Sequence, residues 1–252
     1  MPKQEHSHDH EQDAWKAFVA KLVRPVKPAR QNPIRLVCFD LDGVLIEAQS
    51  SWVAVHEAFG VRNEDSLRLF LHGEISEEEF IRRDVALWIK KKPQVTIDDI
   101  DEILSNIVLH PGAKETIHAL HDHDVKTAVV SGGIANAAHR VAKRLGIPMV
   151  AANELVTLEN RRLSGEGIVN TPLRDKSTPV RRFAKDLGIP LGQVASVGNS
   201  SPDIPMFWSS GLGIAFDPSD EHTRQEADVI VPGPDLRALL PVVLGTRWSK
   251  ED

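Results

Sequence analysis

The sequence predicts an α/β fold in which a doubly wound, mostly parallel sheet is covered by helices on both faces. Three observations support this prediction. Short apolar runs rich in β-branched residues recur along the chain, as in buried strands. Segments with helical periodicity separate them, and Gly, Pro, Ser or Thr stands at many segment ends. The predicted strands cover residues 34–39, 125–130, 194–197, 213–216 and 229–231.

The first 33 residues form a separate N-terminal extension. A short amphipathic helix is predicted at residues 14–23, because its apolar side chains share one face: Trp15, Phe18, Val19 and Leu22. This stripe can pack on the rest of the chain or form a homodimer. The preceding histidines, His6, His8 and His10, have no predicted scaffold that would fix a metal geometry.

The helices between the strands have recognisable ends. Pro111 and Gly112 precede a helix at residues 113–121, and Gly146 ends another at 134–145. A third helix is predicted to have Ser177 or Thr178 as its N-cap, with Pro179 in its first turn and Gly188 after its end. Residues 156–167 indicate a β-hairpin that turns near Glu159 and Asn160.

Residues 47–110 interrupt the alternation, since they contain helical patterns at 50–59, 64–71, 76–90 and 98–108. Ser76 and Glu79 have the spacing of a capping box. An insert directly after the first strand would lie over the carboxyl edge of the sheet, where such sheets bind ligands. We therefore predict an N-terminal extension (1–33), an α/β core (34–46 and 111–252) and a helical cap domain (47–110).

Composition excludes several classes of protein. The 252 residues carry a formal charge of -6, which disfavours a general nucleic-acid binder. The single cysteine, Cys38, cannot form an intramolecular disulfide. No apolar stretch approaches the roughly 18 to 20 residues of a membrane span, and the N-terminus lacks the apolar core of a signal peptide. We expect a cytoplasmic protein with no membrane or nucleic-acid partner.

Candidate catalytic residues follow the predicted strands. Asp40 and Asp42 come directly after the first strand and are followed by Gly43, so one carboxylate could attack or bind a metal while the other serves as acid and base. Ser131 and Gly132 follow the second strand and precede a helix. A hydroxyl and main-chain amides at a helix N-terminus suit a phosphate oxygen.

Two further segments complete the set. Lys176 stands at the start of a helix, where its ammonium could neutralise both a carboxylate and a phosphoryl group. Asn199 and Asp203 follow the strand at 194–197. Their oxygen atoms are ligands of the kind that Mg²⁺ accepts.

In this order, the motifs FDLDGVL, VVSGG, the isolated Lys176 and VGNSSPDIPMF resemble the haloacid dehalogenase-like (HAD) phosphatase superfamily. The pattern is most similar to its phosphoserine phosphatase branch and extends over about residues 34–244. The resemblance implies a Rossmann-like core with an inserted cap, and hydrolysis of a small phosphorylated metabolite.

The resemblance also implies a role for each residue. Asp40 would attack phosphorus, and Asp42 would protonate the leaving alkoxide and later deprotonate water. Asp40, Asp42, Asn199 and Asp203 would hold Mg²⁺. The phosphate and substrate would contact a set that includes Gly43, Gln49, Ser131, Gly132 and Lys176.

Three departures from the family pattern affect specificity and activity. Asn199 stands where the family has an aspartate, which predicts weaker Mg²⁺ binding. Gln49 and Asp84 align with the glutamate and arginine that bind phosphoserine, although Arg82 and Arg83 are adjacent. The predicted substrate is therefore not phosphoserine. A phosphotransferase and a catalytically impaired phospho-ligand-binding relative remain alternatives.

Overall fold

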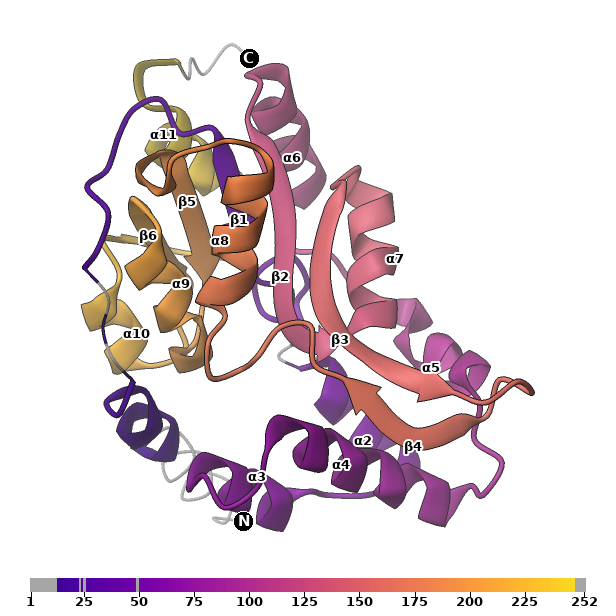
Figure 1. The fold of residues 1–252 in the computed structure, drawn as a ribbon. Helices are drawn as coiled ribbons and strands as arrows, with labels where there is room; N and C mark the ends of the chain where they lie inside the picture. The colour runs from indigo at the N-terminus through magenta and orange to yellow at the C-terminus, as the bar shows by residue number, and fades with distance from the viewer. Residues whose placement is uncertain (1–12, 23, 25, 49, 248–252) are drawn as a thin grey trace, which may run out of the picture.

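The structure of the chain, a computed structural model, describes residues 13–22, 24, 26–48 and 50–247. Seven strands form one sheet: β1 (Leu36–Phe39), β2 (Lys126–Ile134), β3 (Met149–Thr157), β4 (Leu163–Ile168), β5 (Val194–Gly198), β6 (Leu212–Phe216) and β7 (Val229–Val231). Their order is β4-β3-β2-β1-β5-β6-β7 (Figure 1). Neighbours are parallel except β3 and β4, which form the predicted antiparallel hairpin. The predicted α/β fold is confirmed.

Helices cover both faces of this sheet and one of its ends (Figure 1). The helices along the sheet are α6 (Ala113–Asp122), α7 (Ala135–Leu145), α8 (Ser177–Asp186), α9 (Ile204–Ser209), α10 (Glu221–Glu226) and α11 (Leu240–Leu244). Between β1 and α6, a helical insert comprises α2 (Ser51–Phe59), α3 (Glu64–Leu71), α4 (Glu77–Lys91) and α5 (Ile97–Ile103). The insert gathers beyond the carboxyl end of β1, as predicted.

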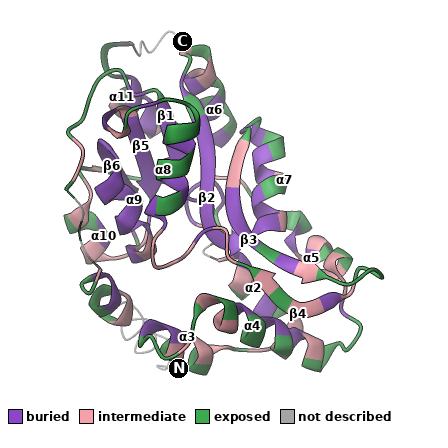
Figure 2. Ribbon diagram, viewed as in Figure 1, coloured by how far each residue is buried: buried purple, intermediate pink, exposed green. Residues whose placement is uncertain are grey.

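The central strand β1 is buried from both sides (Figure 2). Successive side chains of a strand point to opposite faces. Leu36 and Cys38 pack in the cluster that contains Val180 of α8. Val37 and Phe39 belong to the larger cluster on the other face, with α6 and α7. The continuous apolar run therefore reflects two covered faces.

Side-chain caps define the helices of the insert. The hydroxyl of Ser50 accepts from Val53 N and starts α2. Ser76 accepts from Glu79 N at 3.2 Å at the start of α4. The predicted capping box is only half formed, because the Glu79 side chain turns to Arg82 and Arg83. The proposed domain boundaries remain predictions.

Four local predictions were wrong. Residues 131–133 continue β2 as extended backbone instead of forming a turn before α7. The parallel first half of β3 was missed, since its small alanines give a weak strand signal. The predicted helix at 98–108 is shorter: α5 ends at Ile103, and a 3-10 turn follows. Neither Ser177 nor Thr178 caps α8; the cap position is Lys176.

The carboxylate of Asp175 explains how α8 begins. Its Oδ1 accepts from Ser177 N at 3.2 Å, and its Oδ2 accepts from Thr178 Oγ1 at 2.9 Å. The sequence pattern located the helix start but assigned the capping oxygen to the wrong side chain. Lys176 is consequently fixed at the turn that enters the helix.

The N-terminal extension packs on its own chain. Residues 13–19 are helical and a turn follows, so the described helix ends earlier than the predicted residue 23, which is itself undescribed. Phe18 is 7% exposed and Val19 is 1% exposed. The three histidines at 6, 8 and 10 lie outside the described residues. Within the described part of the chain, no helix has both the length and the apolar character that a membrane crossing requires.

Candidate active site

Asp40 follows β1 directly and extends its pairing with β5, because its main-chain N donates to Val197 O at 2.9 Å. The residue is only 4% exposed. Burial, together with the nearby Asp203 carboxylate, raises the pKa of Asp40 above its ordinary range, although Lys176 opposes the shift. A carboxylate in this position needs a cation to remain ionised.

Lys176 supplies a cation at the candidate site. Its Nζ lies 3.0 Å from Asp40 Oδ1 and 2.7 Å from Asp203 Oδ1, and the residue is 3% exposed. Burial alone would lower the pKa of Lys176, but the carboxylates of Asp203 and Asp40 outweigh it and raise that pKa above its ordinary value. The ammonium thus stays charged. It binds Asp40, which lies 136 positions away in the sequence, and Asp203, which lies 27 positions away.

The segment after β5 is held by Asp203. Its Oδ2 accepts from the main-chain N of Asn199 at 2.9 Å and of Ser200 at 3.0 Å. The Asn199 side chain lies against Gly43, where an added Cβ would be 2.1 Å from Asn199 Nδ2. Gly43 also has a φ of +73°, so this position requires glycine for two reasons. The ends of β1 and β5 therefore meet closely.

The end of β2 contributes Ser131 and the glycines after it. Ser131 Oγ accepts from Gly133 N at 2.9 Å. Gly132 O accepts from Trp52 Nε1 at 3.0 Å and from Asn153 Nδ2 at 3.1 Å. With its carbonyl fixed from the insert and from β3, this extended segment has a defined orientation beside Asp40.

Asp42 is held by the first residue of the insert. Its Oδ1 accepts from Ser51 N at 3.1 Å, and its Oδ2 accepts from Ser51 Oγ at 3.2 Å. Burial raises the pKa of Asp42 to about 6, while the main-chain N–H of Ser51 is the largest opposing effect. A carboxyl group that titrates near neutrality suits both proton donation and proton acceptance.

The structure thus brings together Asp40, Asp42, Gly43, Ser131, Gly132, Lys176, Asn199 and Asp203. Gln49 lies outside the described residues.

Asp84 is buried in the insert, where Asn63 Nδ2 donates to both its oxygens at 3.1 Å and His56 Nε2 lies 3.3 Å from Oδ2. The neighbouring Arg82 and Arg83 bind glutamates on the surface instead.

Sequence reasoning did not predict the contacts by which three residues support the site: Ser51, Trp52 and Asn153. Each contacts a partner at least nine positions away, so no local motif reveals the contact. The only local signal was the placement of Ser51 at a helix start, which is common for serine.

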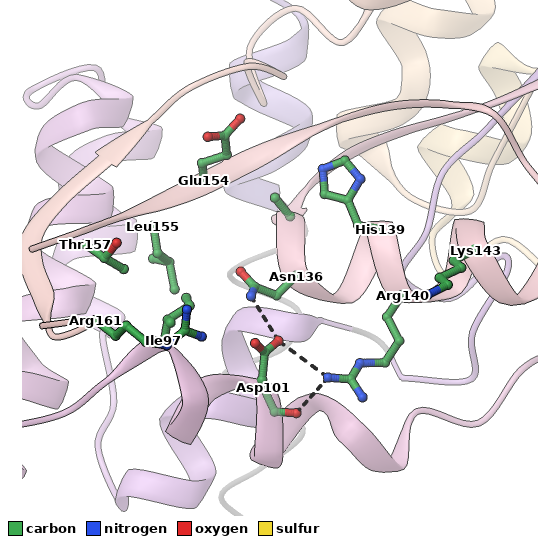
Figure 3. A pocket seen from close by; sticks show the side chains of 11 residues that line it. Ile97, Asp101, Asn136, His139, Arg140, Lys143, Glu154, Leu155, Thr157 and Arg161 are labelled. Carbon is green, nitrogen blue, oxygen red and sulfur yellow. Dashed lines mark hydrogen bonds and ion pairs between the residues drawn. The ribbon is translucent and has the colours of Figure 1, made fainter. Parts of the chain in front are cut away.

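A separate cavity of about 740 Å³ lies between α5, α7 and β3 (Figure 3). It includes none of the predicted catalytic residues. Asp101 in its wall accepts from Asn136 Nδ2 at 2.9 Å, and its main-chain O accepts from Arg140 Nη2 at 3.1 Å (Figure 3). These bonds hold α5 to α7, and the cavity is not a candidate for the chemistry.

The comparison with known families agrees with the geometry. Residues 37–207 match the sequence profile of the haloacid dehalogenase-like hydrolase family. The chain belongs to this family. The match spans the Asp40 segment, the insert, Ser131, Lys176 and Asp203, so the prediction of a HAD-type hydrolase is confirmed.

The similar curated HAD proteins include phosphoserine phosphatases. SerB2 of Mycobacterium tuberculosis is 32% identical over 86% of this chain, which spans only about half (52%) of that relative. The phosphoserine phosphatase of Methanocaldococcus jannaschii is 30% identical over 83% of this chain and is covered over 97% of its length. The resemblance to the phosphoserine phosphatase branch is confirmed.

Solved HAD structures show the same fold. A substrate-bound phosphoserine phosphatase has a TM-score of 0.71 at 26% identity and covers 84% of this chain and 100% of its own. A phosphoserine phosphatase with a phospho-aspartyl intermediate analogue has a TM-score of 0.70, also at 26% identity, and covers 86% of this chain and 100% of its own.

Proposed function

We propose that the chain is a metal-dependent phosphomonoesterase that hydrolyses a small phosphorylated metabolite through an aspartyl phosphate at Asp40. The observation that carries the proposal is the placement of Lys176 between Asp40 and Asp203, at 3.0 and 2.7 Å. Family membership and the phosphoserine phosphatase relatives support phosphoester hydrolysis.

Asp40 attacks phosphorus as the bond from phosphorus to the leaving oxygen breaks. Asp42 gives its proton to that oxygen and then removes a proton from the water that hydrolyses the aspartyl phosphate. Lys176 offsets the negative charge between Asp40 and the phosphoryl group. Ser131 and the main-chain amides near Gly43 and Gly132 bind phosphoryl oxygens.

The family's phosphatases generally work with a divalent metal ion, and the site fits one. Three carboxylates, of Asp40, Asp42 and Asp203, face one ammonium, so the site carries excess negative charge. We propose that Mg²⁺ is held by the Asp40 and Asp203 carboxylates, the Asp42 main-chain carbonyl and the Asn199 amide oxygen, a set of oxygen donors. A bound cation stabilises charge on the transferred phosphoryl group.

Among the residues that the structure describes, no group of three or more His, Cys, Asp and Glu side chains could hold a metal ion. The proposed ligand set does not require such a group. It uses two carboxylate side chains, one amide and one main-chain carbonyl, while the Asp42 carboxylate is bound to Ser51.

We further propose that the substrate is not phosphoserine. Support comes from Asp84, which aligns with the phosphoserine-binding arginine and is bound within the insert by Asn63. A screen that compares phosphoserine with other phosphorylated metabolites tests this choice. If phosphoserine has the highest kcat/KM among the metabolites tested, the proposal is overturned.

The activity is tested by replacing the nucleophile. Asp40→Asn is expected to abolish metal-dependent turnover of p-nitrophenyl phosphate without changing the circular dichroism spectrum. Asp235→Asn, at an exposed carboxylate paired with Arg237, is the matched control and should keep full activity. Retained turnover in Asp40→Asn contradicts the proposal. Product analysis with an added alcohol acceptor separates hydrolysis from phosphotransfer.

A further inference from the structure

The guanidinium of Arg174 joins three segments that are distant in the sequence. Its Nη2 donates to Phe70 O at 2.7 Å and to Ile75 O at 3.2 Å, both in the helical insert. Its central carbon lies 4.5 Å from the ring centroid of Phe70 and 5.2 Å from that of Phe18. One cation thus contacts the insert and the N-terminal helix from the segment that leads to Lys176.

The same segment reaches the candidate active site. Leu173 N donates to Glu77 Oε1 at 2.5 Å, which adds a third hydrogen bond to the insert. The Leu173 side chain lies over Gly132, where an added Cβ would be 2.3 Å from Leu173 Cδ2. Two residues beyond Arg174, Lys176 contacts Asp40 and Asp203. The insert therefore contacts the very segment that carries the catalytic ammonium.

The N-terminal helix packs against both the insert and the core. Phe18 and Val19 share one apolar cluster with Phe70 of the insert and with Phe207 and Trp208 of α9. Arg24 lies over the ring of Trp208 at 5.3 Å and pairs with Glu226, which attaches the extension to the core. The extension lies outside residues 37–207, the part that matches the family.

We propose that Arg174 is a positioning residue that links the N-terminal helix and the closed insert to the placement of Lys176. This inference rests on the proposed function. Outward movement of the insert must either break the bonds of Arg174 to Phe70 O and Ile75 O or displace the segment that carries Lys176. The closed insert and a correctly placed Lys176 therefore form one state, which Phe18 stabilises.

The chemistry of arginine fits this role. A planar guanidinium can stack on aromatic rings while its edge donates hydrogen bonds in fixed directions. A lysine ammonium carries the charge but cannot combine these two contacts. Arg174→Lys is consequently an informative variant, because it retains the charge and a long side chain.

The first test compares kcat and KM of Arg174→Ala and Arg174→Lys with the full-length protein, using p-nitrophenyl phosphate. We expect kcat/KM to fall about 10- to 100-fold in the alanine variant, the loss typical of hydrogen bonds to a charged group, with a clear fall in kcat. Arg174→Lys should recover less than half of this loss on a logarithmic scale. Arg182→Ala, which removes a comparable contact of a guanidinium with the ring of Phe183 within α8, is the control and should change kcat less than about threefold.

A double-mutant cycle tests the path through the N-terminal helix. Phe18→Ala should lower kcat/KM about fivefold in the natural background and have almost no effect when Arg174 is already alanine. Additive effects of Phe18→Ala and Arg174→Ala would overturn the proposal, as would an unchanged kcat in Arg174→Ala.

Hydrogen exchange gives a readout that does not depend on activity. In Arg174→Ala and in Phe18→Ala, the amides of residues 70–77 and of Leu173 should exchange at least about tenfold faster, while β1 and β5 keep their protection. Unchanged exchange in both variants overturns the link. If the natural chain hydrolyses no phosphomonoester, the proposed function fails, and exchange at residues 173–176 in Phe18→Ala still decides whether the helix controls the Lys176 segment.

Discussion

Single residues at the site balance buried negative charge. Lys176 is shared by Asp40 and Asp203, and main-chain amides bind the remaining oxygen of Asp203. Burial of an ionised carboxylate is costly unless it is paired or hydrogen-bonded. The carboxylate of Asp42 is bound by the main-chain N and the hydroxyl of Ser51. Asp40 is thus paired with the ammonium of Lys176, which favours its ionised form, whereas Asp42 is held by the hydroxyl and the main-chain N–H of Ser51.

Ser51→Ala should impair reactions that need a proton from Asp42. The Oγ bond at 3.2 Å orients this carboxyl group, so kcat/KM for an alkyl phosphate should fall at least about tenfold. For 2,4-dinitrophenyl phosphate, whose leaving group departs without protonation, the fall should stay below about threefold. Steady-state kinetics with both substrates measures the difference, and Ser51→Thr should restore most of it. Equal losses for both substrates would mean that Ser51 acts only on the fold.

Asn199→Asp should strengthen metal binding at the proposed site. The substitution preserves the shape of the side chain beside Gly43 and adds one negative charge to an oxygen ligand set. The Mg²⁺ concentration for half-maximal activity should therefore fall about tenfold, and calorimetric titration of the same variant should show the matching change in affinity. If neither the Mg²⁺ concentration for half-maximal activity nor the calorimetric affinity changes, Asn199 does not bind the ion.

At the scale of elements, the sequence predicted which strand ends carry chemistry. Apolar runs located β1 and β5, and the residues after them, Asp40 and Asn199, meet because parallel strands end at the same edge. The sequence did not predict that residues 131–133 continue β2. Glycines disfavour a strand locally, but the bonds of Gly132 O to Trp52 and Asn153 come from tertiary structure.

The start of α4 should make stability depend on pH. Glu77 is half-buried, and its burial raises its pKa to about 7, although Leu173 N and Arg174 oppose the shift and Glu78 adds to it. Because the folded-state pKa lies above the ordinary value of 4.5, this group favours folding fully below pH 4.5, and that contribution is lost as pH rises through about 7.

Glu77→Gln keeps an oxygen for Leu173 N and removes the ionisation. The variant should match the natural chain in free energy of unfolding at pH 4.5 and exceed it by about 1–3 kcal/mol at pH 8. Urea denaturation across this range measures the difference between the two proteins, which cancels the shared contribution of Asp40 and Asp42. Glu78→Gln at the exposed neighbour is the control. If the difference in free energy of unfolding between Glu77→Gln and the natural chain does not change with pH, Glu77 is not the source of the pH dependence.

At the scale of the whole molecule, the N-terminal helix covers apolar side chains where the insert meets the core, among them Phe70 of the insert and Phe207 and Trp208 of α9. The predicted stripe is occupied within its own chain, by contacts of Phe18 and Val19 with the cluster around Phe207. These contacts favour packing on the same chain over the homodimer that the stripe alone also allows. They also explain why a segment outside the family match contributes to the core.

Removal of residues 1–22 should therefore expose the apolar side chains between the insert and the core to solvent, rather than dissociate a dimer. Phe70, Phe207 and Trp208 are at most 5% exposed in the full chain, and losing their cover should cost several kcal/mol of unfolding free energy, at about 1.5–3 kcal/mol for each large apolar side chain exposed. Sedimentation should show the full chain as one species of 27.9 kDa and the truncated chain as a mixture that associates with rising concentration. Phe18→Ala should shift stability in the same direction by a smaller amount without changing the mass. A full-length dimer that becomes a stable monomer on truncation would instead assign the stripe to the contact between two copies.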